Sequence, residues 1–332
     1  MMIISRTPVR ISFFGGGTDY PAFYERSKGA VLGTTINKYT YVSVNTLSEF
    51  FEYNIRIGYS KTELVKHFDE IQHPSIRECL KHKNISGNLD IHIFSDLPAK
   101  TGLGSSSSFT VGFLNALYAL QGKKISKQNL ASEACHVEQN LIKENVGSQD
   151  QFHSAFGGFN IIEFEKENIH VRPIVIAQEK LKFLEDHLII FYTGLTRFAS
   201  DVVKEQIDKT KSKSNDKYLM KMLDMVYIAE DILSNSPSDL MVKQFGELLN
   251  ESWNLKKMLS SKISNPQIDI DYETAMKNGA FGGKLCGAGS GGFLAFVAPK
   301  ENHAKIRNDL KHLLEVSFKF ENQGSTIIYM KD

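Results

Sequence analysis

The chain has 332 residues, a length that suggests about two domains with sizeable cores. Its 39 Lys and Arg nearly balance its 38 Asp and Glu, so no overall field favours nucleic acid or an anionic membrane. Three separated cysteines fit no disulfide framework, the N-terminus lacks a secretory signal, and no apolar run approaches the length of a membrane span. We therefore expect a cytoplasmic protein that binds a small molecule and neither nucleic acid nor membrane, as a monomer or homodimer.

The first part of the chain combines strand-like segments with a glycine-rich turn. Residues 9–14 and 31–44 are rich in β-branched and aromatic residues and predict strands. Between them, the run GGGTDY at residues 15–20 allows a sharp turn or a close backbone contact. Residues 61–81 have an amphipathic pattern, which predicts a helix.

A Gly/Ser-rich turn then leads into a helix in the stretch DLPAKTGLGSSSSFTVGFLNALYAL. Phe109, Phe113 and Leu117 recur at four-residue spacing and share one helix face. Gly102 and Gly104 allow a tight turn with exposed backbone N–H groups, and the serines that follow are typical N-cap residues. Amides and helix dipole would both face an anion, which predicts a phosphate site. A Ser-capped helix without a ligand is the structural alternative.

The second part of the chain contains more helix and a second glycine-rich turn. Ser126 is positioned to cap a helix, residues 145–150 (NVGSQD) break it, and residues 188–192 form a buried type of strand. Further helices are expected, one of them over 240–259 with Trp253 on its apolar face. The fold class is therefore mixed α+β, and we divide the chain into an N-terminal domain, 1–180, and a C-terminal domain, 181–332.

The second glycine turn matches the dinucleotide-binding pattern G-x-G-x-x-G in residues 287–292. That fingerprint requires a following helix and a ribose-binding acid about 20 residues later. Here the turn runs into FLAFVA, a strand-like segment, which argues against a dehydrogenase. The P-loop pattern and the protein-kinase motifs are absent from the sequence, so neither of these kinase classes is supported.

Three segments together resemble the motifs of the GHMP kinases, named after galacto-, homoserine, mevalonate and phosphomevalonate kinases. They are P-x-R at residues 8–10, P-x-x-x-G-L-G-S-S at 98–106 and K-x-x-G-A-G-x-G-G at 284–292. Ser108 stands where the family usually has a smaller residue such as Ala. The resemblance covers nearly the whole chain. It implies a two-domain fold, with an N-terminal domain like domain 2 of ribosomal protein S5, an α/β C-terminal domain, and the active site in the cleft between them.

The resemblance also implies roles for individual residues in phosphoryl transfer from ATP with Mg²⁺. Asp150 would accept or orient the proton of the attacking hydroxyl, and Arg10 would keep Asp150 ionised and stabilise the transferring charge. Ser106 and Glu138 would bind Mg²⁺. The structural alternatives are a turn-forming Asp, an exposed strand Arg and a solvated helix Glu. The ATP phosphates would be wrapped by the loop residues Thr101, Gly102, Leu103, Gly104, Ser105, Ser106 and Ser107.

The acceptor is expected to be a sugar, because the T-D-Y ending of the first motif matches the sugar-kinase branch. The substrate wall would comprise Gly16, Gly17, Thr18, Asp19, Gly287, Ala288, Gly289 and Ser290. The segments GGGTD and ENVGSQDQ resemble most closely the branch that phosphorylates D-glycero-D-manno-heptose 7-phosphate at its anomeric hydroxyl, for bacterial surface polysaccharide. Arg197 would then hold the sugar phosphate. Another sugar-1-kinase, for fucose, mannose or galactose, and a non-catalytic sugar and nucleotide sensor stay open.

Overall fold

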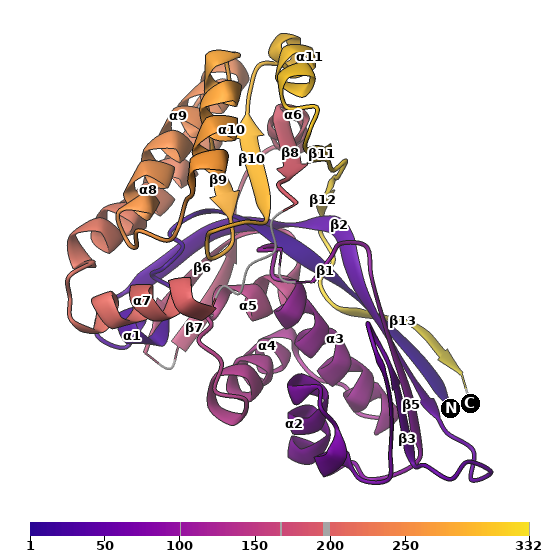
Figure 1. Ribbon diagram of the computed structural model, residues 1–332. Helices are drawn as coiled ribbons and strands as arrows, with labels where there is room; N and C mark the ends of the chain where they lie inside the picture. Colours follow the sequence, from indigo (N-terminus) through magenta and orange to yellow (C-terminus); the bar gives the residue numbers. More distant parts are fainter. Residues whose placement is uncertain (100, 167, 195–199, 332) are drawn as a thin grey trace.

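The computed structural model describes residues 1–99, 101–166, 168–194 and 200–331, which form two sheets with helices packed around them (Figure 1). The large sheet has the order β13-β1-β2-β5-β3-β4. In addition, β6 and β12 pair with β2, and β7 pairs with β6. Its pairings are antiparallel except for the parallel pair β3–β5. Its strands are β1 (Met2–Phe14), β2 (Gly29–Thr46), β3 (Ile55–Gly58), β4 (Thr62–Val65), β5 (Leu89–Ser95), β6 (Phe159–Glu165), β7 (Asn168–Pro173), β12 (Phe320–Glu321) and β13 (Thr326–Lys331).

The small sheet is antiparallel, with the order β11-β8-β10-β9. Its strands are β8 (Leu188–Tyr192), β9 (Gly282–Cys286), β10 (Phe293–Val297) and β11 (Leu314–Glu315). β9 and β10 are buried along their whole length. The second glycine-rich turn joins these two strands, as the sequence predicted.

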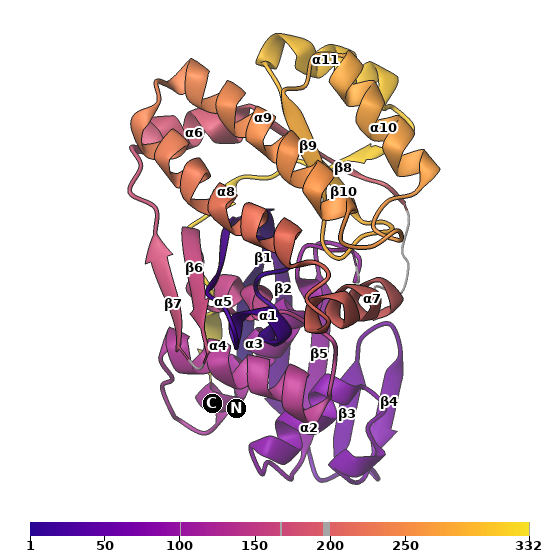
Figure 2. The same cartoon turned by 90° about the vertical axis from the view of Figure 1, so that its left-hand side faces the viewer.

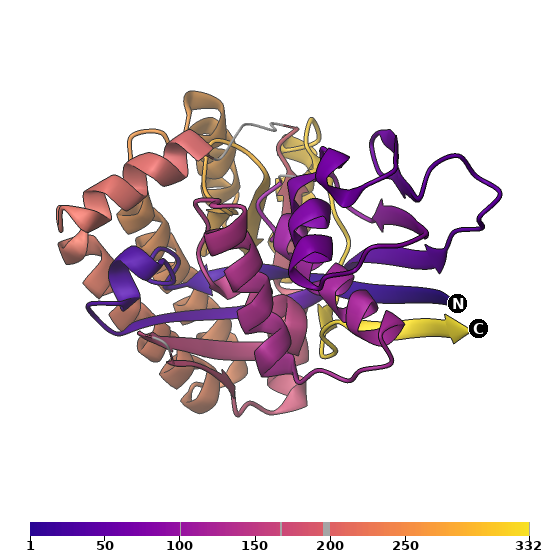
Figure 3. The ribbon, with the colours of Figure 1, turned by 90° about the horizontal axis from the view of Figure 1, so that it is seen from below.

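The helices cover both faces of the large sheet. The first helices along the chain are α1 (Pro21–Tyr24), α2 (Pro74–His82), α3 (Ser105–Leu120), α4 (Lys127–His136) and α5 (Gln149–Phe156). Figure 3 shows α2 to α5 together below the sheet. The later helices are α6 (Gln178–Asp186), α7 (Ser200–Lys211), α8 (Asp216–Asn235), α9 (Ser238–Lys257), α10 (Pro266–Lys277) and α11 (Lys300–Asp309). Figure 2 shows α8 and α9 on the opposite side, where α8 packs on β1 and β2, and α9 also contacts β9 and β10 of the small sheet.

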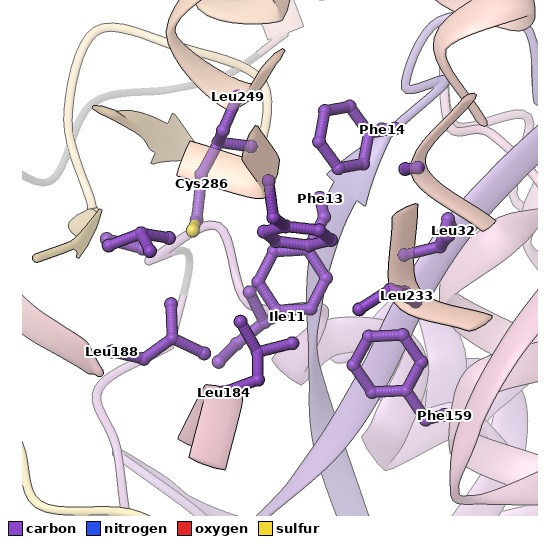
Figure 4. Close-up of a cluster of buried hydrophobic side chains, with 14 of the residues drawn as sticks. Ile11, Phe13, Phe14, Leu32, Phe159, Leu184, Leu188, Leu233, Leu249 and Cys286 are labelled. Carbon is purple, nitrogen blue, oxygen red and sulfur yellow. The ribbon is translucent and has the colours of Figure 1, made fainter. Parts of the chain in front are cut away.

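Alternate residues of β2 belong to two different cores, because successive side chains of a strand point to opposite faces. Ala30 and Leu32 belong to the core under α8 and α9, whereas Val31 belongs to the core under α3. The first of these cores also includes Cys286 of β9 and Leu188 of β8 (Figure 4). A single hydrophobic core therefore joins the two sheets.

Two features differ from the sequence-based expectations. The helix predicted over 61–81 is wrong in its first half, where β4 pairs with β3 and the helix α2 begins only at Pro74. Proline lacks an N–H and disfavours helical backbone before it, so it starts a helix far better than it continues one. In addition, β12 and β13 return to the large sheet, where β13 pairs with β1. The predicted domain boundary near residue 180 stays a prediction.

Helix ends follow the sequence in one case and not in another. The Ser126 side chain accepts a hydrogen bond from Asn129 N at 3.1 Å and caps α4, as expected. In α3, by contrast, Gly104 occupies the N-cap position, so the expected serine cap is wrong. Within the described residues, no helix combines the length and the apolar character needed to cross a membrane.

His153 of α5 is a buried titratable group beneath the large sheet. Its ring abuts β2 so closely that a Cβ added at Gly33 would lie 2.8 Å from Nε2. Neither ring nitrogen has a hydrogen-bond partner within the described residues. Burial, with a smaller contribution from the charge of Arg10, lowers the pKa of His153 to about 3. The folded protein therefore holds this imidazole neutral.

We predict that His153 makes the fold acid-sensitive. The unfolded chain binds this proton near the ordinary histidine pKa of 6.5 but the folded chain only near 3, so the unfolded state binds more protons between these values. Stability should therefore fall as the pH drops through this window, by about 1.4 kcal/mol per pH unit from this group. Urea unfolding at pH 6.5 and 4.5 should show a smaller decrease for His153→Leu than for the unmodified chain. The exposed His170→Leu serves as control, and equal decreases in all three proteins would contradict the prediction.

Candidate active site

A cavity of about 500 Å³ lies where the two sheets meet. Its wall includes residues of β1, of the glycine-rich turn after β1, of the loop before α3 and of the second glycine-rich turn. The segment before α5 and the helix α9 also contribute. Segments far apart in the sequence thus contribute to one pocket. The contacts between these segments determine which polar groups face the cavity.

Arg10 of β1 is the side chain that ties these segments together. It is 4% exposed, and its Nε donates to Asp150 Oδ1 at 2.8 Å. Its Nη2 lies 2.6 Å from the same oxygen, and its Nη1 donates to Gly102 O at 2.8 Å. Its backbone N donates to Leu103 O at 2.9 Å. One guanidinium therefore binds both the loop before α3 and the first turn of α5, and holds them next to each other.

The second carboxylate oxygen of Asp150 faces the start of α3. A Cβ added at Gly104 would lie 3.1 Å from Asp150 Oδ2, and no donor within the described residues is bonded to this oxygen. The Asp150 side chain is 25% exposed, toward a cavity that it lines. The carboxylate thus has one oxygen held by Arg10 and one left for a ligand.

The N-terminus of α3 opens onto the cavity without a capping side chain. Gly104 takes a left-handed conformation with φ of 78° as the N-cap, and Ser105 and Ser106 line the cavity beside it. The next two serines are turned elsewhere: Ser107 Oγ donates to Glu138 at 2.8 Å, and Ser108 Oγ donates to Thr7 O at 3.0 Å. First-turn amides without a side-chain cap leave the helix end suited to an anion.

The remaining loop residues hold the turn in place rather than lining the cavity. Thr101 is buried and its hydroxyl donates to Pro98 O at 2.8 Å. Leu103 is buried in the core that joins the sheets. Of the predicted phosphate-binding residues, the cavity is thus lined by Gly102, Gly104, Ser105 and Ser106.

The loop before α3 and the second glycine-rich turn, residues 287–292, pack backbone against backbone. A Cβ added at Gly102 would lie 2.4 Å from Cys286 O, and one at Gly287 would lie 2.3 Å from the Gly102 Cα. A Cβ at Gly292 would meet Thr101 O at 2.3 Å. Both Gly102 and Gly287 also have positive φ, 85° and 88°. Only glycine allows this approach, which fixes the loop before α3 against the C-terminal domain.

Glu138 is a buried carboxylate in a short π-helix, Val137–Leu141, at the end of α4. Its Oε2 accepts hydrogen bonds from Ser107 Oγ and Gln151 Nε2, while Oε1 is buried without a partner in the described part of the chain. Burial raises the pKa of Glu138 to about 7, although its hydrogen bonds oppose this shift. A buried, half-satisfied carboxylate of this kind would gain from a cation.

Asp19 belongs to the turn between β1 and α1. It is 1% exposed, with Oδ1 accepting from Gly17 N at 2.8 Å and Oδ2 from Gln149 Nε2 at 2.9 Å. Burial raises its pKa, and the charge of Asp150 adds to that shift. Gly16, Gly17 and Asp19 line the cavity, and their role toward a substrate stays a prediction.

Three other predicted substrate residues are turned away from the cavity. The Thr18 hydroxyl lies 2.8 Å from both Gly15 O and Ala30 O, which share its single proton, so Thr18 holds the turn. Gly289 packs against the backbone of Ile263, and Ser290 N donates to Ile263 O at 2.9 Å. Of the second glycine-rich turn, Gly287 and Ala288 line the cavity. Arg197 lies outside the described residues, and its role stays a prediction.

Sequence reasoning assigned no role to two buried lysines that line the cavity. Lys284 Nζ donates to Ser12 O and Phe13 O at 2.7 and 2.8 Å, and Lys256 Nζ donates to the carbonyls of Leu285 and Gly287. Burial lowers the pKa of Lys284 to about 7 and that of Lys256 to about 8. Lys284 stands in the third motif, but Lys256 has no local signal, because it lies within an ordinary amphipathic helix.

Comparison with known proteins identifies relatives along most of the chain. The family description of the GHMP kinases N terminal domain matches residues 63–158, and that of the GHMP kinases C terminal matches residues 240–315. The D-glycero-alpha-D-manno-heptose 7-phosphate kinase of Campylobacter jejuni is 29% identical over 322 residues, covering 92% of each chain. The galactokinase of Pyrococcus furiosus is 27% identical over 357 residues, covering 96% of this chain and 95% of that protein.

A solved structure agrees with this at the level of the fold. The crystal structure of a D-glycero-D-manno-heptose 1-phosphate kinase from Bacteroides thetaiotaomicron superimposes with a TM-score of 0.78. The match covers 99% of this chain and 100% of that one, at 20% sequence identity. The two-domain architecture expected from the motifs is therefore confirmed.

We predict that Gly102→Ala will weaken the contact between the two turns. Any L-residue at its positive φ costs about 1–2 kcal/mol, and here the new Cβ would also clash with Cys286 O at 2.4 Å. Gly122→Ala is the matched control, since Gly122 has φ of 65° but nothing within 4 Å of an added Cβ. In urea unfolding, Gly102→Ala should lose clearly more stability than Gly122→Ala. Equal losses would show that the contact contributes nothing.

Proposed function

The chain belongs to the GHMP kinase family, whose sugar kinases use ATP, and from this premise we propose that it phosphorylates the anomeric hydroxyl of D-glycero-D-manno-heptose 7-phosphate to give the 1,7-bisphosphate. One observation carries the site assignment. The Arg10–Asp150 pair stands in a single cavity between an uncapped helix N-terminus and the Asp19 turn. The heptose assignment is supported by the similarity to the Campylobacter jejuni enzyme and by the segment before Asp150.

Phosphoryl transfer depends chiefly on positioning and charge compensation, so few catalytic side chains are needed. In the proposed reaction, the first-turn amides of α3 bind the terminal phosphates of ATP. Asp150 Oδ2 accepts a hydrogen bond from the acceptor hydroxyl and can take its proton, while Arg10 stabilises charge on the transferring group. The product would carry the new phosphate on the anomeric oxygen.

A Mg²⁺ ion fits the residues near α3. Magnesium is usually held by one or two carboxylates together with substrate phosphates. Glu138 offers a buried oxygen with no partner in the described residues, and Ser106 lines the cavity at the helix end. No group of three or more His, Cys, Asp or Glu in the described residues could hold a metal alone. When bound, the ion would neutralise charge on the phosphates.

The two buried lysines support an anionic acceptor. An ammonium group has three N–H donors, and Lys256 and Lys284 each use two of them on backbone carbonyls. Neither forms an ion pair with a carboxylate within the described residues. When protonated, each therefore has one donor left, and an anion bound in the cavity would favour this protonated form over the neutral amine that burial favours.

The function is tested by a coupled assay of ATP consumption across sugars and sugar phosphates. We expect the highest kcat/KM for D-glycero-D-manno-heptose 7-phosphate, with phosphorylation at C1 identified by NMR of the product. A free hexose or fucose as the best acceptor would replace the heptose assignment with another sugar-1-kinase. Absence of turnover with every sugar would overturn the enzyme assignment in favour of a sensor.

Asp150→Asn is expected to lower kcat by on the order of 10²-fold or more, because an amide oxygen is a poor proton acceptor. Nucleotide binding, measured by calorimetry, should persist, since α3 supplies the phosphate contacts. Asp186→Asn is the control, because Asp186 forms only surface ion pairs with Lys182 and Lys300. Near-full turnover of Asp150→Asn would remove Asp150 from the chemistry.

Glu138→Gln is expected to raise the Mg²⁺ concentration needed for half-maximal activity by about 10-fold or more. Melting of the nucleotide-free protein at pH 8 should not be lowered, because the amide removes a buried carboxylate whose pKa is about 7. Glu133→Gln in the preceding helix α4 is the control, since Glu133 bonds Lys83 and Tyr118 instead. An unchanged Mg²⁺ dependence for Glu138→Gln would contradict the metal assignment.

A further inference from the structure

Two side-chain oxygens in the cavity are buried and unpartnered within the part of the chain that the structure describes. They are Ser12 Oγ and Gln149 Oε1, from residues that are 6% and 9% exposed. Both residues line the cavity. A Cβ added at Gly16 would lie 4.0 Å from Ser12 Oγ and 3.9 Å from Gln149 Nε2, so the two side chains flank the same glycine. Buried polar atoms are rarely left unpaired, which points to a ligand here.

The orientation of Gln149 is determined by Asp19. A carboxylate oxygen only accepts hydrogen bonds, so the group that faces Asp19 Oδ2 at 2.9 Å must be the amide nitrogen. The amide oxygen is therefore directed elsewhere, and it is the atom left without a partner among the described residues. Asp19 is itself anchored by Gly17 N at 2.8 Å. The turn thus fixes Asp19, and Asp19 fixes Gln149.

The chemistry of the free oxygens identifies the class of ligand. An amide oxygen can only accept, so Gln149 Oε1 needs a donor. Ionised phosphate oxygens of a nucleotide cannot supply one, whereas a sugar hydroxyl can. Ser12 Oγ can donate or accept, and it suits a second hydroxyl. The pair is therefore suited to a hydroxyl-bearing sugar and unsuited to the phosphates of ATP.

We infer that Gln149 and Ser12 select the acceptor by hydrogen bonding to two of its hydroxyls, and that Asp19 is a positioning residue that acts through Gln149. This inference deepens the proposed function and rests on it for the acceptor being a sugar. It adds to the expectation that Asp19 itself accepts hydroxyls, because each Asp19 oxygen has one partner and keeps a lone pair for a ligand. A site built on hydrogen bonds to hydroxyls discriminates strongly against analogues that lack them, because its buried polar groups are then left unpaired.

The test uses Gln149→Met and Ser12→Ala with the preferred sugar of the assay and its monodeoxy analogues. The unmodified chain should lose about 10-fold or more in kcat/KM on the analogue that lacks the hydroxyl read by Gln149. Gln149→Met should lose a similar factor on the parent sugar and no longer distinguish it from that analogue. Ser12→Ala should do the same for a different hydroxyl. The KM for ATP should stay within about twofold, as for the surface control Gln128→Met.

Asp19→Asn tests the positioning role. An asparagine keeps the contact with Gly17 but can present its amide N–H to Gln149, so the Gln149 amide rotates and its oxygen leaves the sugar. This variant should lose discrimination at the same hydroxyl as Gln149→Met. The double variant should be no worse than either single one, because both act through one contact. Additive losses would overturn the positioning role.

Uniform loss on all sugars, deoxy analogues included, would show a merely structural effect and overturn the inference. A raised KM for ATP in Gln149→Met would place this residue on the nucleotide and overturn it as well. Binding of the sugars to the nucleotide-free protein, measured by calorimetry, distinguishes failure of this inference from failure of the proposed function. If no sugar is phosphorylated but Gln149→Met still removes discrimination in binding, the inference stands and the enzyme assignment fails.

Discussion

The site depends on the ion pair between Arg10 and Asp150. The guanidinium is nearly inaccessible, and it divides its donors between a carboxylate in α5 and a carbonyl of the loop before α3. This arrangement holds the uncapped N-terminus of α3 and the Asp150 carboxylate, the groups to which we assign ATP and the acceptor, in a fixed relation. Catalysis of phosphoryl transfer requires just such a relation, because a small misplacement of the reacting groups costs rate. Removal of Arg10 would leave two segments without their common anchor.

That relation is supported by packing outside the site. The core that contains Phe13 continues into α9 and β9, and the glycine-rich turns touch through their backbones. Relative motion of the two sheets would therefore break an apolar core as well as a turn contact. We conclude that the wall formed by β1, Gly102 and Gly287 is preorganised. We propose that the Asp19 turn and α5, which line the same cavity as this wall, recognise the acceptor.

Much of the site was predictable because its motifs are continuous in sequence. The turn at Gly102 and Gly104 needs glycine for its backbone, and the resulting pattern is visible without a structure. The roles of Thr18 and Ser107 were not predictable, since they depend on which way a hydroxyl turns after folding. Lys256 was missed because a buried lysine in a helix looks the same in sequence as an exposed one. The helix expected across residues 61–81 overlooked Pro74 as a start point and the pairing of β4 with β3.

The pairing of β13 with β1 has a consequence for folding during synthesis on the ribosome. The strand that begins the chain has partners on both edges, and one of them is β13, formed by Thr326–Lys331 (Figure 1). During synthesis β1 can pair with β2 early, but its other edge stays unpaired until β13, far downstream of β2 in the sequence, has been made. An unpaired strand edge invites pairing with other chains. Until β13 has formed, the exposed edge of β1 is therefore open to pairing with other chains.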